Sequence, residues 1–210
     1  HSREDSLRAF EAILKSGIKL GVQTMIGLVG DTAEKALSTA LTAAEYNPET
    51  VRIYPTLVIK GTELERLFLE GKYTPLSLQE AVDIAAQLLG VYYENNINVI
   101  RVGLQPTSEL NEGSEVAAGP FHPAFRHLAE SRLVRNKINQ LLRNMLGNTC
   151  SGYPESITIY ANPGKISEAT GYKRENIEYF KSKYGFKHIK VTPKIKIGKY
   201  EIEIDPCCRL

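Results

Sequence analysis

The sequence lacks the features of several protein classes. Its 210 residues include no Trp, two Met and three Cys, and the Cys spacing is not that of a zinc site or a disulfide framework. Reduced thiols are therefore expected at Cys150, Cys207 and Cys208. Charged residues interrupt the longest apolar stretches before they reach the roughly 20 residues that span a bilayer. We expect a cytoplasmic protein that does not cross a membrane.

The first residues also lack the marks of a natural start. Neither an initiator Met nor an apolar signal region precedes the first helical pattern, which follows His1 almost directly. The N-terminus resembles a cut site, so we expect this chain to be part of a longer protein. Whether it is a proteolytic product or a natural chain stays open.

The net charge of +2 hides an asymmetry along the chain. Residues 1–125 carry 10 Lys and Arg against 16 Asp and Glu, whereas residues 126–210 carry 16 against 8. The second part is therefore a candidate surface for a polyanion.

Hydrophobic patterning predicts an α/β protein with a parallel sheet. Helices are expected up to residue 17, after residue 31 or 32, and over 63–69, 77–93 and 123–147, and strands over 18–28, 51–59 and 98–103. The strands show little polar alternation, which is typical of a sheet covered by helices on both faces. Residues 104–121 have no periodicity and predict a long loop, either functional or disordered.

Residues 151–210 predict a small, basic α+β module. Strands are expected over 157–160 and 189–191, on either side of a helix over 174–184. Residues 194–197 and 200–204 alternate in polarity around a Gly-Lys pair, which predicts a hairpin. The predicted organisation is thus residues 1–94, an extension over 95–150 with a strand, a loop and a long basic helix, and the module.

One segment has the form of a ligand-binding turn. Residues 23–32, QTMIGLVGDT, run from a strand through two glycines to a helix start. Such a turn brings backbone N–H groups and a helix N-terminus to the end of a strand, where ligands bind in parallel sheets. Any tight strand-to-helix connection also favours glycines, so a ligand-binding turn and a purely structural turn both stay open.

Together with the helix before it, this segment is similar to the fifth-strand region of radical S-adenosylmethionine (radical SAM) barrels, with Val29 in place of the usual proline. Residues 51–64, VRIYPTLVIKGTEL, resemble the sixth-strand region of the catalytic subunit of Elongator, a tRNA-modifying radical SAM family. Their GTxL ending also recurs in oxygen-independent coproporphyrinogen III oxidases. Residues 99–106, VIRVGLQP, resemble the next strand of Elongator-like bacterial proteins. The resemblance covers residues 1–145 and includes bacterial Fe-S oxidoreductases.

The resemblance implies the C-terminal half of a parallel (β/α) barrel of the TIM-barrel kind. The full-length enzyme would use S-adenosylmethionine and a 4Fe-4S cluster held by a CxxxCxxC motif, which this chain lacks, so no metal ligand is expected here. The chain alone should be inactive. Its partners would be the missing N-terminal half, RNA such as tRNA, and, through an exposed strand edge, other copies of itself.

The resemblance also assigns roles to individual residues. It implies cofactor contacts for Gln23, Gly27, Tyr54 and Pro55. It implies substrate-side catalytic roles for Arg101, Gln105 and His122. The competing interpretations are a polar residue satisfied inside the barrel for Gln23, a buried and paired side chain for Arg101, and a helix-capping loop residue for His122.

The basic tail supplies candidate nucleic-acid contacts. These are Lys173, Arg174, Lys181, Lys183, Lys187 and Lys190, interleaved with Tyr172, Tyr179, Phe180, Tyr184 and Phe186. Lysines neutralise phosphates and aromatic rings stack on unpaired bases. The alternative is a helix in which Ile177 and Phe180 face the core while the lysines on the other side are solvated surface.

Three functions therefore remain in competition. The first is a radical SAM enzyme acting on RNA, the second is a radical SAM oxidoreductase acting on a small molecule such as a porphyrinogen, and the third is a non-catalytic binding module. Affinity for tRNA that falls steeply with salt would favour the first.

Overall fold

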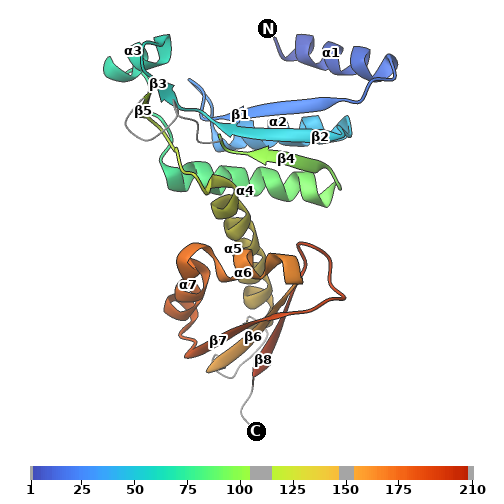
Figure 1. Cartoon of the computed structure of the whole chain (residues 1–210), viewed down its shortest axis with the longest axis vertical. Helices are drawn as coiled ribbons and strands as arrows, with labels where there is room; N and C mark the ends of the chain where they lie inside the picture. The colour runs from blue at the N-terminus through green and yellow to red at the C-terminus, as the bar shows by residue number, and fades with distance from the viewer. Residues whose placement is uncertain (1, 105–114, 147–153, 208–210) are drawn as a thin grey trace. The chain divides into compact units, whose positions relative to one another are not determined.

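The computed structural model describes residues 2–104, 115–146 and 154–207 and divides the chain into two compact units, His1–Arg126 and His127–Leu210 (Figure 1). The division falls inside helix α5 (Phe125–Leu146). The sequence instead placed segment boundaries near residues 94 and 150.

The first unit is built on a three-stranded parallel sheet. Its order is β1 (Gly21–Ile26), β2 (Thr50–Pro55) and β4 (Asn98–Val102), with β2 in the centre. Helix α1 (Arg3–Lys15) precedes β1, α2 (Ala33–Glu45) connects β1 to β2, and α4 (Leu78–Glu94) leads into β4. The predicted α/β class with a parallel sheet is confirmed.

The two faces of this sheet differ. Val22, Ile26, Val51 and Ile53 are buried, and α2 and α4 pack together on this side. The residues that alternate with these buried ones along β1 and β2 point to the opposite face, where Met25 is 43% exposed. The expectation that helices cover both faces is therefore wrong for the described part of the chain.

The predicted strand over 51–59 is two strands. After β2 the Thr56 side chain and amide both donate to the carbonyl oxygen of Ile26, at 2.8 and 2.9 Å, and the chain turns into β3 (Val58–Ile59). Strand β3 pairs antiparallel with β5 (Val116–Ala118), which lies in the stretch predicted to be a loop. Three residues are too short for a periodicity to be visible in the sequence.

Helix starts agree with the sequence. Ser2 and Ser77 form complete capping boxes with Asp5 and Glu80, and Thr32 caps α2. Helix α3 (Glu63–Leu69) has the predicted bounds. Each capping box gives hydrogen-bond partners to two backbone N–H groups at the helix start. This explains why the first residue of these helices could be predicted from the sequence.

The second unit has a mixed three-stranded sheet of order β7-β6-β8. Central strand β6 (Ser156–Ala161) pairs parallel with β7 (His188–Pro193) and antiparallel with β8 (Ile202–Cys207). Helices α5, α6 (Ile166–Thr170) and α7 (Glu175–Tyr184) supply the rest of its core. Core members include Ile138, Leu142, Ile157, Ile159, Phe180 and Phe186.

The predicted hairpin over 194–204 is wrong. Strand β7 ends at Pro193, and β8 pairs with β6 rather than with β7. The residues that connect β7 to β8 do not alternate in a strand. Ile197 is buried and its carbonyl oxygen accepts from the Asn162 side chain at 3.1 Å, whereas Ile195 is 86% exposed. The alternating sequence therefore belongs to a crossover loop.

No helix in the described ranges combines the length and apolar character needed to cross a membrane.

Candidate functional site

The uncovered face of the first sheet carries a row of polar side chains. In the strand register Gln23 of β1 lies beside Arg52 of β2, and Arg52 lies beside Arg101 of β4. The next row, toward the carboxyl ends of the strands, pairs Met25 with Tyr54. Arg52 and Arg101 form no ion pair with other residues in the described part of the chain. Two neighbouring guanidinium groups and an amide suit an anionic or polar ligand.

The turn after β1 is fixed by hydrogen bonds to Asp31 and Tyr73 and by close packing against Leu76. The Gly27 amide donates to Asp31 Oδ2 at 2.8 Å, and the Tyr73 hydroxyl donates to the Gly27 carbonyl oxygen at 2.6 Å. Burial raises the pKa of Tyr73, so it stays a protonated donor at neutral pH. Gly27 has φ +81°, and a Cβ there would lie 2.7 Å from Leu76 Cδ1. Gly27 is therefore required by the fold, whatever it contacts in a ligand.

Replacing Gly27 and Gly30 separately should distinguish packing from backbone strain. Both have positive φ, +81° and +74°, but nothing lies within 4 Å of a Cβ at Gly30. Gly30→Ala should cost about 1 kcal/mol, and Gly27→Ala roughly 2–3 kcal/mol, because Leu76 must also move. Urea unfolding measures both, and equal losses would contradict the packing explanation.

The predicted site residues do not all lie together. Gln23, Tyr54 and Arg101 share the open face, and Arg101 is exposed rather than buried and paired. Pro55 is buried on the other side, in a small hollow that His122 also lines.

His122 makes a contact that agrees with the helix-capping role, the alternative to catalysis. Its Nδ1 accepts from the Ala124 amide at 3.0 Å at the start of α5. Gln105 lies outside the described residues. The roles assigned to these residues stay predictions.

Sequence reasoning missed Arg52 as a site residue. The signal was present, because Arg52 and Tyr54 are two residues apart on one strand and must share a face. The sequence did not predict that Arg101 lies beside Arg52. Ile100 is an extra residue on β4, and this irregularity in the strand pairing brings Arg101 opposite Arg52.

Strand β1 has an uncovered apolar edge. A cleft of about 660 Å³ between α1, β1 and α2 is lined by apolar side chains, among them Leu7, Phe10 and Val29, and by polar ones such as Asp31 and Lys35. No residue of α1 is buried, and Val29 is 55% exposed. Exposed apolar surface of this kind is typical of interaction sites, ligand grooves and aggregation-prone surfaces.

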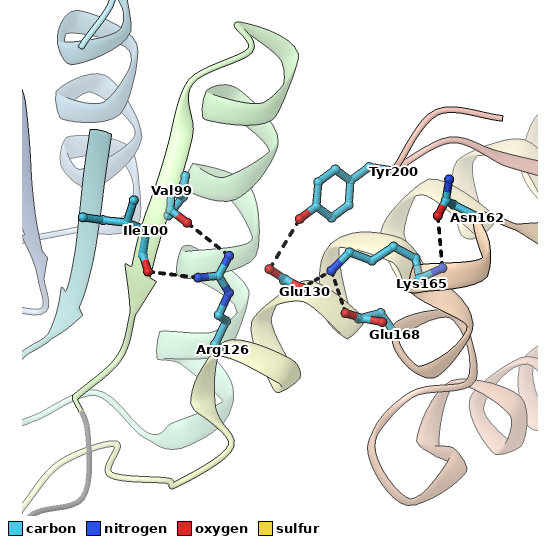
Figure 2. A network of polar contacts seen from close by, with 9 residues as sticks. Val99, Ile100, Arg126, Glu130, Asn162, Lys165, Glu168 and Tyr200 are labelled. Carbon is cyan, nitrogen blue, oxygen red and sulfur yellow. Dashed lines mark hydrogen bonds and ion pairs between the residues drawn. The ribbon is translucent and has the colours of Figure 1, made fainter. Parts of the chain in front are cut away.

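The opposite edge, at β4, is partly capped. The Arg126 guanidinium donates to the carbonyl oxygens of Val99 and Ile100 at 3.1 and 3.2 Å (Figure 2). A cation on edge carbonyls discourages pairing with another strand. Of the two edges, β1 is therefore the one open to an additional strand.

In the second unit, the structure gathers four of the six predicted basic contacts. Arg174, Lys181, Lys187 and Lys190 line a cleft of about 410 Å³ together with His188. Lys183 is instead engaged with the Tyr179 hydroxyl, at 2.7 Å, and Lys173 lies over the Tyr172 ring.

The aromatic side chains of this region do not form a stacking surface. Phe180 and Phe186 are 0% and 3% exposed, and Tyr184 stacks between them. The alternative that Ile177 and Phe180 face the core is therefore confirmed, and Tyr184 and Phe186 are buried as well.

Among the described residues, no three His, Cys, Asp or Glu side chains come together in a way that would hold a metal ion. Cys150 and Cys208 lie outside the described ranges.

Comparison with known proteins finds radical SAM and Elongator relatives for part of the chain. Residues 48–135 match the Radical_SAM C-terminal domain. Over 87 residues the chain is 34% identical to a tRNA uridine(34) acetyltransferase of Methanocaldococcus infernus, covering 40% of this chain and 16% of the relative. It is 27% identical over 136 residues to Elongator complex protein 3 of Mus musculus, covering 63% of this chain and 24% of that protein.

A solved structure has a similar fold. N-terminally truncated Elp3 of Methanocaldococcus infernus matches with a TM-score of 0.53 and 23% identity, over 71% of this chain and 32% of that one. The matched residues thus resemble the C-terminal portion of Elongator-like radical SAM proteins, as the sequence predicted. It spans less than a third of the length of each of these relatives.

Proposed function

We propose that strands β1, β2 and β4 are part of a radical SAM barrel whose other strands lie elsewhere in a longer protein. The observation that carries the proposal is the open polar face bounded by the uncapped β1 edge. In a barrel such a face lies in the interior, and further strands pair with the edge that is open here. Closure would also cover the apolar side chains along β1.

The open face fits S-adenosylmethionine. The Gln23 amide and the Tyr54 hydroxyl are polar groups near the carboxyl ends of neighbouring strands, where barrel enzymes bind their ligands. They would bind the adenosine, and Arg52 and Arg101 would attract anionic groups. When bound and reductively cleaved, the cofactor supplies a 5′-deoxyadenosyl radical.

The residues of this chain do not fit the 4Fe-4S cluster. Its three thiolates would come from a CxxxCxxC motif, and the sequence contains none. The proposal therefore places the cluster on the remainder of the protein, and the 210-residue chain alone should be inactive. A cytoplasmic location agrees with this division of roles.

RNA, and tRNA in particular, is the substrate class that we favour. Relatives named for tRNA uridine modification match the chain, and the second unit has a basic cleft. Polyanion binding and radical chemistry would then lie in different units of one protein.

Anaerobic reconstitution of the longer protein with iron and sulfide tests this function. We expect 5′-deoxyadenosine to form and tRNA to become modified. Gln23→Ala should lower the rate at least about tenfold, because it removes a cofactor contact. Asn98→Ala, at the other end of the same sheet, is the matched control.

The outcomes separate the alternatives. Turnover with a porphyrinogen but not with tRNA would move the substrate to small molecules. Absence of 5′-deoxyadenosine from a protein with a loaded cluster would leave only a binding module.

The isolated chain should also self-associate through the β1 edge. Sedimentation velocity should show concentration-dependent oligomers of the chain and a monomer of the longer protein, because closure would cover the same edge. A monomeric chain at high concentration would contradict this.

A further inference from the structure

The basic cleft of the second unit is built from three elements. Arg174 precedes α7, Lys181 lies within α7, and Lys187, His188 and Lys190 lie at and along the start of β7. The strand register places Ser156 of β6 beside His188, and Thr158 beside Lys190. Five basic groups and two hydroxyls therefore surround one hollow.

The charge of this cleft is only partly neutralised. Lys187 pairs with Glu155 at 2.6 Å and Lys181 approaches Glu178 at 3.7 Å, and all four side chains are at least 38% exposed. Exposed ion pairs of this kind are weak and exchange readily for another anion. Arg174 and Lys190 have no ion pair with any residue in the described ranges. The cleft therefore keeps a positive field.

The spacing along β7 suits a repeating anion. His188 and Lys190 are two residues apart and project from the same face. At the strand rise of about 3.3 Å per residue, their Cα atoms are roughly 6.6 Å apart. Successive phosphates of a nucleic-acid strand are separated by a similar distance, so each of these groups can contact a different phosphate.

The backbone beside the cleft is strained. Lys173 and Arg174 have φ +50° and +66°, left-handed values that cost a residue with a Cβ about 1 kcal/mol each. Glycine would relieve this strain, yet two long cations stand at these positions. Of the two, Arg174 extends into the cleft.

We infer that this cleft binds backbone phosphates of the RNA substrate. The identity of the polyanion rests on the proposed function, whereas the cleft itself is a feature of the second unit. Arg174 and Lys190 make the main phosphate contacts, Lys181 and Lys187 exchange their carboxylates for phosphate, and Ser156 and Thr158 line the floor. The contacts position the RNA and carry no sequence information.

The test measures binding of an in vitro transcribed tRNA to the whole chain over a series of salt concentrations. Four phosphate contacts predict a slope of log affinity against log salt of about −3. The double variant Arg174→Gly/Lys190→Gln removes two of the four contacts, so it should reduce the magnitude of this slope by about 1.5 and weaken binding roughly 10–100-fold at 0.1 M salt.

The matched control is Lys196→Gln/Lys199→Gln. It removes the same charge from exposed positions of the same unit outside the cleft. Binding of this variant should change less than about threefold. Because Arg174→Gly relieves strain, the cleft variant should unfold at a temperature no lower than the parent, which separates lost binding from lost folding.

The outcomes separate the two proposals. Equal losses in the cleft and control variants would overturn the phosphate cleft but leave RNA as substrate. No binding of tRNA by the parent chain at low salt would overturn both. Cleft-dependent binding of phosphatidylserine vesicles, with tRNA binding unchanged by the cleft variant, would overturn the RNA assignment. Cleavage of S-adenosylmethionine without RNA, in the reconstituted longer protein, should be equal in both variants.

Discussion

Lys165→Met is expected to destabilise the second unit by about 3–5 kcal/mol. Lys165 Nζ lies 2.5 Å from Glu130 Oε2 and 2.6 Å from Glu168 Oε1, with the three side chains 10%, 5% and 11% exposed (Figure 2). Removing the cation leaves two carboxylates buried side by side. Tyr200 also loses a cation over its ring, at 4.9 Å. Urea unfolding followed by circular dichroism measures the loss.

Lys194→Met is the matched control for this prediction. Lys194 pairs with Glu203, but the two side chains are 43% and 49% exposed, so the loss should stay below about 1 kcal/mol. Adding Glu130→Gln and Glu168→Gln to Lys165→Met should recover much of its larger loss, because no buried charge then remains. Similar losses for the two lysines would show that burial is not the cause.

The same ion pairs give a dependence on pH. Burial opposes the charge on Lys165, but hydrogen bonds to Glu130 and Glu168 outweigh it and raise its pKa. The stabilisation is then fully present below the ordinary lysine pKa of about 10.4 and is lost as pH rises through the raised value. The difference between the parent and Lys165→Met should therefore be constant from neutral pH to about pH 10 and shrink above it.

Asn176→Asp is expected to cost at least about 3–5 kcal/mol in the same unit. Asn176 is fully buried, and its Nδ2 donates to the carbonyl oxygens of Ser131 and Glu168 at 3.0 and 2.9 Å. These bonds join α7 to α5 and α6. A carboxylate donates nothing and would face two carbonyl oxygens, so both bonds become repulsive contacts.

Asn139→Asp provides the control with the same chemical change. Asn139 is also buried, but its Oδ1 accepts from the Tyr184 hydroxyl at 2.9 Å and from Lys183 Nζ at 3.3 Å. A carboxylate keeps both bonds and gains attraction to Lys183. Asn139 Nδ2 also donates to the Tyr179 hydroxyl at 3.2 Å, and this hydroxyl can rotate to donate to the new carboxylate oxygen, so the loss should be under about 1.5 kcal/mol. Thermal unfolding of the two variants should differ widely, and equal melting temperatures would contradict the assigned directions of these hydrogen bonds.

The parts of the fold that could be predicted are governed by local rules. Capping boxes at Ser2 and Ser77 place two helix starts, and the apolar positions of β1 and β2 identify both strands. Strand partners are not local. Strand β8 pairs with β6 rather than with its neighbour β7, because the connection crosses β6, and an alternating sequence is equally compatible with either partner.

The sequence predicts those features of the candidate site that depend on a single strand, such as the face on which a side chain lies. Alternation along β2 places Tyr54 on a face and Pro55 on the opposite one, although the sequence interpretation had grouped the two. The approach of Arg101 to Arg52 depends on the irregularity at Ile100, and the basic cleft depends on how α7 is placed beside β7. Neither has a signal in spacing or composition.

Hydrogen exchange at β1 tests the barrel account most directly. In a parallel ladder alternate residues of a strand bond to opposite neighbours, so about half of the β1 amides face away from β2. In the isolated chain, at a concentration low enough to keep it monomeric, these amides should exchange fast, while those of β2 are slow. In the longer protein the same β1 amides should become strongly protected. Unchanged exchange at β1 in the longer protein would contradict the claim that strands from outside this chain complete its sheet.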